Sequence, residues 1–220
     1  MIAENLLSNN IIPLRTSETG EEALGLMSEF MIRHLPIVNN IQLLGLLSED
    51  DILNHDVEEP VGSYDLSIGA HVRVRTKDHL YEVMRILAEN ELTAVPVIDE
   101  EDNYGGLITL EDLLLYFANT TTFREPGSIL VLETNRHSYT LAEIARIVES
   151  ENALILSSFV SSNPDSTRVE VTIKVNVRHL QPILATFQRF NYDIKATFSE
   201  SDYLDSLKER YDGLMAYLNV

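Results

Sequence analysis

Two short segments of the chain place a glycine, a hydroxyl group and a carboxylate at the same spacing. They cover residues 45–51 (GLLSEDD) and 106–112 (GLITLED). Their matched positions are Gly45, Ser48 and Asp51 in the first segment and Gly106, Thr109 and Asp112 in the second. A glycine lets a ligand approach the backbone closely, and a hydroxyl at a helix start suits an anionic oxygen. The carboxylate can accept two hydroxyl hydrogen bonds, as a ribose diol requires, so both segments are candidate sites for a phosphorylated nucleoside.

The same spacing has a purely structural interpretation. Ser or Thr followed three residues later by an acid is the capping box of a helix N-terminus, and capping by itself would account for both residues. The sequence leaves binding and capping as alternatives at each segment.

The two segments belong to a duplication. Thr16 matches Thr76, and residues 35–38 (LPIV) match 95–98 (VPVI), at a constant offset of 60. One residue is inserted in the acidic turn 99–103, after which the offset is 61. Apolar periodicity within each copy predicts strand, helix, two strands and a second helix. One copy leaves a sheet face uncovered, so repeats 1–60 and 61–122 are expected to pack sheet to sheet.

Residues 1–118 resemble a tandem pair of cystathionine-β-synthase (CBS) domains. The resemblance rests on the apolar-Pro-apolar strands at 35–37 and 95–97, the doubled Gly to Asp segment, and the tandem order. The resemblance implies that the protein binds adenosine nucleotides. In each segment the aspartate would bind the ribose, and the hydroxyl residue would lie near the phosphate. The implied ligands are AMP, ADP, ATP or an S-adenosylmethionine-like molecule, with or without Mg²⁺. The residues of the chain by themselves do not predict a particular cofactor. The ligand-binding residues that we predict are Gly45, Ser48, Asp51, Thr76, Pro96, Gly106, Thr109 and Asp112.

Local charge favours the second segment for a phosphorylated ligand. Carboxylates flank both segments, at Glu49 and Asp50 in the first and at Glu111 in the second, and would repel phosphates. The first strand of the first repeat offers only Arg15 as a cation. Cationic or titratable groups around the corresponding strand of the second repeat are Arg73, Arg75, Lys77 and His79. We therefore expect the first site to take a less anionic ligand or none.

The pattern changes after the breaker cluster 124–127. Residues 127–201 alternate strands and amphipathic helices in the order β-α-β-β-α-β, which predicts a ferredoxin-like domain. This domain resembles the ACT domain, but the loop 133–138 lacks the glycine common in that family, which favours dimerisation over amino-acid binding. A CBS pair followed by an ACT-like domain resembles the acetoin-utilisation regulators. Residues 202–220 predict a C-terminal helix, docked within the chain or onto a partner helix.

Composition narrows the function. The net charge is −19, from 16 basic and 35 acidic residues, which argues against nucleic acid and anionic membranes as partners. No apolar run reaches the roughly 20 residues of a membrane span. The absence of cysteine fits a cytoplasmic protein. None of the six histidines forms a metal-binding pair, and no catalytic motif is present, so we predict no metal site and no catalytic residue.

The sequence thus predicts an α+β protein that is not an enzyme: a regulatory, ligand-sensing C₂ homodimer that binds an adenosyl ligand and acts on an unidentified regulated protein. The alternative is a dimeric interaction scaffold with vestigial ligand sites, and a more remote one is an unrecognised enzyme.

Overall fold

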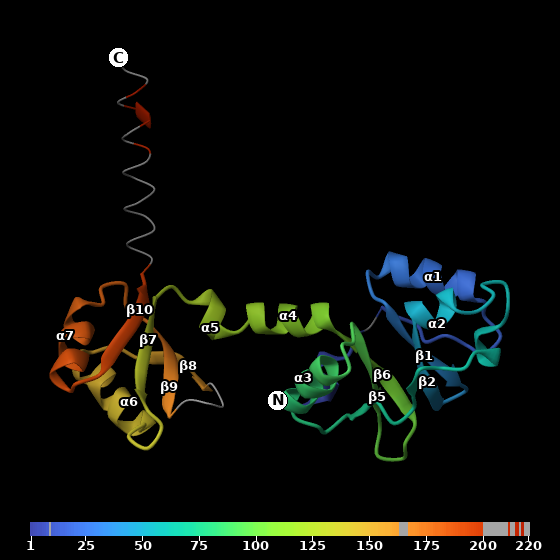
Figure 1. Ribbon diagram of the computed structural model, residues 1–220, viewed down its shortest axis with the longest axis horizontal. Helices are drawn as coiled ribbons and strands as arrows, with labels where there is room; N and C mark the ends of the chain where they lie inside the picture. Colours follow the sequence, from blue (N-terminus) through green and yellow to red (C-terminus); the bar gives the residue numbers. More distant parts are fainter. Residues whose placement is uncertain (9, 163–166, 200–210, 212–213, 216, 218–220) are drawn as a thin grey trace. The chain divides into compact units, whose positions relative to one another are not determined.

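The chain folds into two compact units, Met1–Ala118 and Asn119–Val220, each described here by itself (Figure 1). The computed structural model describes residues 1–8, 10–162, 167–199, 211, 214–215 and 217. The predicted C-terminal helix over 202–220 lies outside the described residues, apart from the four at 211, 214, 215 and 217, which are helical.

The first unit contains the two repeats. In chain order its elements are η1 (Ala3–Leu6), α1 (Gly20–Glu29), β1 (His34–Asn39), β2 (Gln42–Ser48), α2 (Glu49–Leu53), η2 (Val61–Ser63), β3 (Ile68–Gly69), β4 (Val74–Arg75), α3 (Leu80–Glu89), β5 (Ala94–Ile98), β6 (Tyr104–Thr109) and α4 (Leu110–Ala118). They form two three-stranded sheets, β1-β2-β3 and β4-β5-β6. The predicted order of elements is confirmed, although the first strand of repeat one is reduced to a single parallel bridge between Leu14 and Ile37.

Each repeat contributes a segment to the sheet of the other repeat. Ile68, in the first strand of the second repeat, pairs with Leu46 of β2. The corresponding Ser8 pairs with Leu107 of β6. The turns that precede these two segments also bind to the other repeat. The Ala3 amide donates to the Asp78 carbonyl at 2.9 Å, and the Val61 amide donates to the Glu18 carbonyl at 2.8 Å. The periodicity of the sequence did not predict this exchange.

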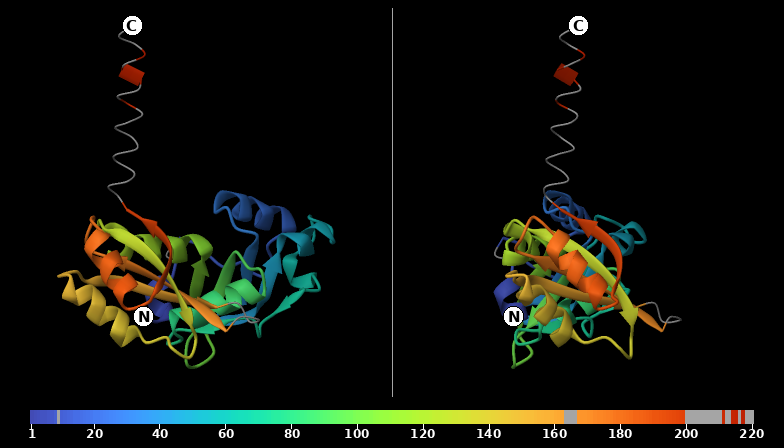
Figure 2. Two further views of the ribbon diagram at one scale, coloured as in Figure 1. Left: turned by 60° about the vertical axis from the view of Figure 1, so that its left-hand side comes forward. Right: turned by 90° about the vertical axis from the view of Figure 1, so that its left-hand side faces the viewer.

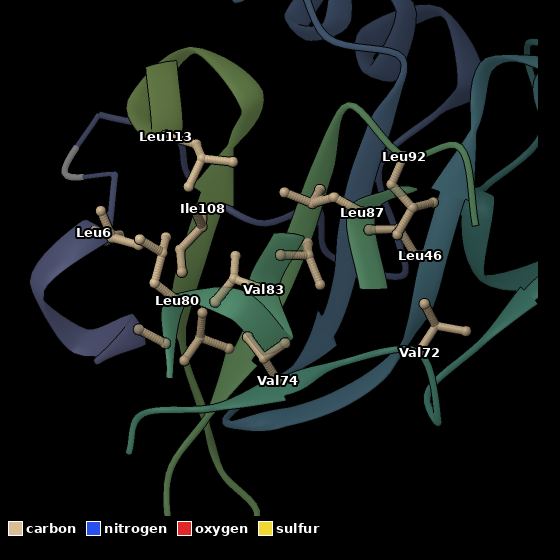
Figure 3. Packing of buried hydrophobic residues seen from close by; sticks show 13 residues of the cluster. Leu6, Leu46, Val72, Val74, Leu80, Val83, Leu87, Leu92, Ile108 and Leu113 are labelled. Atoms are coloured by element: carbon tan, nitrogen blue, oxygen red, sulfur yellow. The ribbon is translucent and has the colours of Figure 1, made fainter. Parts of the chain in front are cut away.

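The hydrophobic cores show the same exchange of segments between the repeats. Leu6 from the N-terminal turn and Leu46 from β2 pack in the core of the second repeat, together with Val83 of α3 (Figure 3). Leu107 of β6 packs in the core of the first repeat, with Leu35 and Leu47. Burying a leucine side chain stabilises the fold by about 1.5–3 kcal/mol. The two repeats therefore stabilise each other and do not behave as separate domains.

The second unit is a four-stranded antiparallel sheet with helices on one face. Its elements are α5 (Thr121–Arg124), β7 (Ser128–Asn135), α6 (Leu141–Ser150), β8 (Ile155–Ser162), β9 (Arg168–Val175), α7 (Gln181–Arg189) and β10 (Asp193–Phe198). The strand order is β10-β7-β9-β8, which confirms the predicted βαββαβ arrangement. Helices α6 and α7 lie on the same face of the sheet (Figure 2), because alternate strand residues such as Leu130 and Ile173 pack against Ile144 and Phe187. No helix within the described ranges is both long and apolar enough to cross a bilayer.

A polar cavity at the start of helix α2

The first Gly to Asp segment lies at a cavity of about 380 Å³ in the first unit. Strand β2 ends at Ser48 and α2 begins at Glu49, so the turn between them forms one wall. The start of β1, the residues before β3 and the end of α3 supply the other walls. The lining residues are Arg33, His34, Ser48, Glu49, Asp50, Asp51, Asn54, Ser67, Ile68, Asn90 and Glu91. Both repeats therefore contribute to this cavity.

Asp51 is the most constrained side chain of the cavity. Its Oδ2 accepts hydrogen bonds from the Ser48 amide at 3.0 Å and the Ser67 hydroxyl at 3.1 Å, and its Oδ1 accepts from the Ser67 amide at 3.2 Å. The Asp51 amide in turn donates to Ser48 Oγ at 3.0 Å, which completes a capping box. A carboxylate offers about four lone-pair directions. Three of them are filled from described residues, and one on Oδ1 remains for a ligand hydroxyl.

These hydrogen bonds keep Asp51 ionised. Burial by itself raises the pKa of the carboxyl, but the bonds donated by Ser48 and Ser67 outweigh burial and lower the pKa below its usual range. Asp51 is only 6 % exposed. The cavity therefore presents a fixed negative acceptor with little competition from water.

His34 joins the two repeats at the edge of the cavity. Its Nδ1 accepts a hydrogen bond from the Thr93 amide at 3.1 Å and lies 2.9 Å from Thr93 Oγ1, which itself accepts from the Arg33 amide. Burial and the neighbouring Arg33 lower the pKa of His34. A neutral imidazole that accepts at Nδ1 carries its proton on Nε2, so His34 is a hydrogen-bond donor through Nε2.

The cavity is strongly acidic. Its ionised lining consists of four carboxylates, at Glu49, Asp50, Asp51 and Glu91, and one guanidinium, at Arg33. A phosphate in this cavity would face more repulsion than attraction unless a cation accompanied it.

The second Gly to Asp segment keeps its capping geometry without the polar surroundings. Thr109 Oγ1 and the Thr109 amide both lie within hydrogen-bond distance of Asp112 Oδ2, at 2.6 and 3.0 Å, and the Asp112 amide donates back to Thr109 Oγ1. Among the described residues, the hydrogen bonds of the Asp112 carboxylate therefore all run to Thr109. The capping interpretation is confirmed at both segments.

Apolar side chains replace most of the polar lining in the second repeat. At the offsets of the duplication, Leu7 stands for Ser67, Leu110 for Glu49 and Leu115 for Asn54. Phe30 and Met31 stand for Asn90 and Glu91. The nearby cavity of about 420 Å³ between α3 and α4 is lined mainly by aliphatic side chains, including Met84, Leu87, Leu92, Leu110 and Leu113. The two sites of the pair thus have different chemistry on the same backbone.

The two glycines of the motif serve packing. A Cβ on Gly45 would lie 2.6 Å from Leu66 Cδ1 and 3.1 Å from the Ile68 carbonyl. A Cβ on Gly106, whose φ is +147°, would lie 2.9 Å from Leu7 Cδ2. Both glycines thus admit the exchanged segments of the chain, and their predicted contact with a ligand stays a prediction.

Thr76 and Pro96 lie in the sheet of the second repeat. The Thr76 amide donates to the Ile98 carbonyl, and its own carbonyl accepts from the Glu4 amide. Pro96 is buried and pairs with Leu107 in the β5–β6 ladder. The structure therefore does not bring these two residues to the polar cavity.

Our expectation that cations serve the second site has no support in the structure. Arg73 and Arg75 both contact Asp102 in the acidic turn 99–103, and Lys77 pairs with Glu100. His79 accepts from the Tyr81 amide at the start of α3. Arg75 lies beside Ile98, whereas Thr109 pairs with Ala94 at the opposite end of β5. Four residues of strand separate the two ends, about 13 Å.

Sequence reasoning missed Ser67 and Thr93, and it did not include His34 among the predicted ligand-binding residues. Ser67 precedes a strand of two residues, which is too short to show a periodic signal. The duplication offers one clue. The hydroxyl residue Ser67 corresponds to the apolar Leu7, and the hydroxyl residue Thr93 corresponds to the cationic Arg33, so the two repeats differ in side-chain chemistry at both positions.

The CBS domain family model matches residues 3–58 and 70–119. The chain belongs to the CBS-domain family and carries a tandem pair of these domains, as the sequence predicted. It is 30 % identical over 122 residues to the magnesium transporter MgtE of Thermus thermophilus, a match that covers 51 % of this chain and 26 % of the transporter. The matches span less than half the length of the curated relatives.

Two solved structures of similar proteins also cover about half of this chain. A CBS domain pair/ACT domain protein from Thermotoga maritima is 20 % identical, with a TM-score of 0.48, over 53 % of this chain and 96 % of its own. A putative acetoin utilization protein (AcuB) from Vibrio cholerae is 25 % identical, with a TM-score of 0.47, over 54 % of this chain and 91 % of its own. The ACT-like interpretation of residues 127–201 stays a prediction.

Proposed function

We propose that this chain is a regulatory, ligand-sensing protein that binds an adenosyl ligand in the polar cavity of the first repeat. One observation carries the proposal: the cavity holds an ionised, buried carboxylate, Asp51, oriented by Ser48 and Ser67. A capping box requires the bonds between Ser48 and Asp51 but not those from Ser67. The additional bonds fix the carboxylate in one orientation, as a ligand acceptor requires.

The remaining lining matches the other parts of an adenosyl group. A ribose hydroxyl donates to the open direction on Asp51 Oδ1, and the Ser67 hydroxyl oxygen accepts a second one. His34 donates through Nε2 to a ligand acceptor, and Ile68 packs against the base. A cavity of about 380 Å³ is within the range of small-ligand sites.

Charge selects among adenosyl ligands. Four lining carboxylates against one guanidinium disfavour a polyphosphate and favour a neutral or cationic substituent, as in adenosine or an S-adenosylmethionine-like ligand. A nucleotide is favoured only when a divalent cation accompanies it and offsets the repulsion between its phosphates and these carboxylates. The ligand class is thus set by the first repeat, and the second repeat contributes mainly packing.

Titration calorimetry with adenosine, S-adenosylmethionine, AMP and ATP, the last two with and without Mg²⁺, tests the proposal. We expect Asp51→Asn to weaken binding of the tightest of these ligands by about 10- to 100-fold, because a hydrogen bond to a charged group contributes about 1.5–3 kcal/mol. Asp112→Asn is the matched control, since it makes the same change in the capping box of the second repeat, and we expect less than about a twofold effect.

Two outcomes would contradict the proposal. Equal losses in both variants would show that the substitutions act through helix capping. Loss only in Asp112→Asn would move the site to the second repeat.

A second candidate function is a dimeric interaction scaffold with vestigial ligand sites. The apolar replacements around Thr109 and Asp112 favour it for the second repeat. If none of the adenosyl probes binds the wild-type chain, the scaffold becomes the better description of the whole pair.

A further inference from the structure

The aliphatic cavity between α3 and α4 adjoins the polar cavity at the start of α2. Both cavities belong to the first unit, and Arg33 and Glu91 line both of them. His34 lines the polar cavity, and its Nδ1 lies 2.9 Å from the hydroxyl of Thr93, which lines the aliphatic one. The two cavities therefore share part of their walls.

A chain of hydrogen bonds links the starts of the two helices. The Glu49 amide at the start of α2 donates to the Arg33 carbonyl at 3.0 Å. The Leu110 amide at the start of α4 donates to the Thr93 carbonyl, also at 3.0 Å. The Arg33 amide completes the link by donating to Thr93 Oγ1 at 2.8 Å. Because Arg33 and Thr93 are equivalent positions of the duplication, the pairing of the repeats itself brings a polar and an aliphatic cavity together.

The aliphatic cavity has a buried floor and a partly exposed rim. Its floor includes Leu87, Leu92 and Leu113, which belong to the core of the second repeat (Figure 3). Met84 and Leu110 line the cavity with 39 % and 47 % of their surface exposed. Apolar side chains exposed around a concave surface are typical of a binding site. The lining suits an uncharged aliphatic group.

The boundary between the cavities is not closed by an ion pair. The side chains of Arg33 and Glu91 are both exposed. Within the part of the chain that the structure describes, neither of them forms an ion pair with the other or with a third residue. A ligand can therefore extend between these two side chains without breaking a charge pair.

We propose that the ligand of the polar cavity carries an uncharged aliphatic arm that extends past Arg33 and Glu91 into the aliphatic cavity. The proposal rests on the proposed function, in which Asp51 and Ser67 bind the ribose and Ile68 packs against the base. With these groups in place, the 5′ substituent of the ribose faces the remaining walls, which include Arg33 and Glu91. The ligand class is thereby narrowed to adenosine with an alkyl or acyl chain at its 5′ position.

Titration calorimetry of the full chain with adenosine and with its 5′-methylthio, 5′-propylthio and 5′-hexylthio derivatives tests the arm. The dissociation constant should fall by up to about fourfold for each methylene added, because each methylene that enters the aliphatic cavity leaves water. Adenosine itself has no arm and reports the polar cavity alone.

Leu110→Glu is the variant that separates the two cavities. It places at the aliphatic rim the residue that the first repeat has at the equivalent position, Glu49. We expect it to weaken the hexyl derivative by about tenfold or more and to change adenosine by less than about twofold, because the carboxylate must be desolvated only when the arm is bound. Leu114→Glu is the matched control, since Leu114 lies one turn later on α4, is 69 % exposed and is not part of the cavity lining. This control should leave both affinities unchanged.

The outcomes distinguish failure of the arm from failure of the proposed function. Equal affinities for adenosine and the hexyl derivative, both weakened by Asp51→Asn, would overturn the arm and leave the proposed function intact. Hexyl binding that persists in Asp51→Asn would show that the aliphatic cavity binds independently of the polar one, which also overturns the arm. If neither adenosine nor any derivative binds, the proposed function fails and the arm fails with it. If Leu110→Glu lowers the mass of the chain in light scattering but leaves hexyl binding unchanged, the rim is a protein contact and not a ligand site.

Discussion

The two CBS repeats share a backbone and differ in the residues around one turn. In both, a β-strand ends in a hydroxyl residue that caps the next helix, with a carboxylate three residues later. In the first repeat Ser67 also binds that carboxylate, and ionisable side chains line the cavity. In the second repeat Leu7 and Leu110 occupy the matching positions. Capping is retained in the second repeat, where the polar lining is lost. The doubled motif therefore indicates the fold, whereas the residues around it indicate whether a ligand can bind.

The largest effects we predict test the symmetric part of this comparison. Leu46 and Leu107 are equivalent in the duplication, and each is fully buried in the core of the other repeat. Truncating a buried leucine to alanine removes its burial and leaves a cavity, which costs about 2–5 kcal/mol. Leu46→Ala and Leu107→Ala should therefore lower the free energy of unfolding by similar amounts, measured by urea denaturation.

Leu114→Ala is the control for both truncations. Leu114 lies on α4 with its side chain 69 % exposed, so its removal should change stability by no more than about 0.5 kcal/mol. If either Leu46→Ala or Leu107→Ala were as mild as this control, the segment exchange would not be mutual.

A smaller effect separates capping from binding. Ser48 Oγ and Thr109 Oγ1 each accept the amide of the aspartate three residues later, both at 3.0 Å. Ser48→Ala and Thr109→Ala should each lower the free energy of unfolding by about 1 kcal/mol, the usual cost of a lost N-cap. Only Ser48→Ala should also weaken the adenosyl ligand in calorimetry. Equal weakening by Thr109→Ala would show that these substitutions affect binding through helix capping and not through the cavity.

The sequence was sufficient for the parts of the fold that repeat or alternate over many residues. The offset of 60 and 61, the amphipathic helices and the alternating strands of the second unit each rest on several positions, so single exceptions did not mislead. The ferredoxin-like order β10-β7-β9-β8 follows from such patterns.

The parts that the sequence did not predict depend on single contacts between distant residues. Strand β3 has two residues, and its partner strand lies in the other repeat. Ser67 reaches Asp51 across 16 positions, and His34 reaches Thr93 across 59. No local pattern encodes these contacts. The prediction that Arg73 and Arg75 favour a phosphate at the second site lacks support for the same reason. Both side chains pair with Asp102, a contact that no local sequence pattern predicts.

The smallest effect that we predict concerns pH and is confined to one repeat, because Ala94 stands in the second repeat where His34 stands in the first. Burial and Arg33 lower the pKa of His34 from its usual 6.5. Between the lowered value and 6.5 the unfolded chain binds more protons at this position than the folded chain does. The stabilisation is therefore fully present above pH 6.5 and is lost as the pH falls toward the lowered pKa.

His34→Gln tests this directly, because an amide oxygen can still accept the Thr93 amide hydrogen while nothing titrates. Urea denaturation at several pH values should show a shallower fall in the free energy of unfolding below pH 6.5 for the variant than for the wild type. The difference in slope cannot exceed about 1.4 kcal/mol per pH unit, the limit for one proton. Identical slopes would mean that His34 has the same pKa in the folded and the unfolded chain, so that below pH 6.5 it would be protonated in the folded chain as well. A protonated imidazole still donates through Nε2 but cannot accept the Thr93 amide hydrogen at Nδ1, so that result would contradict the hydrogen bond that joins His34 to the second repeat and weaken the asymmetry between the two repeats.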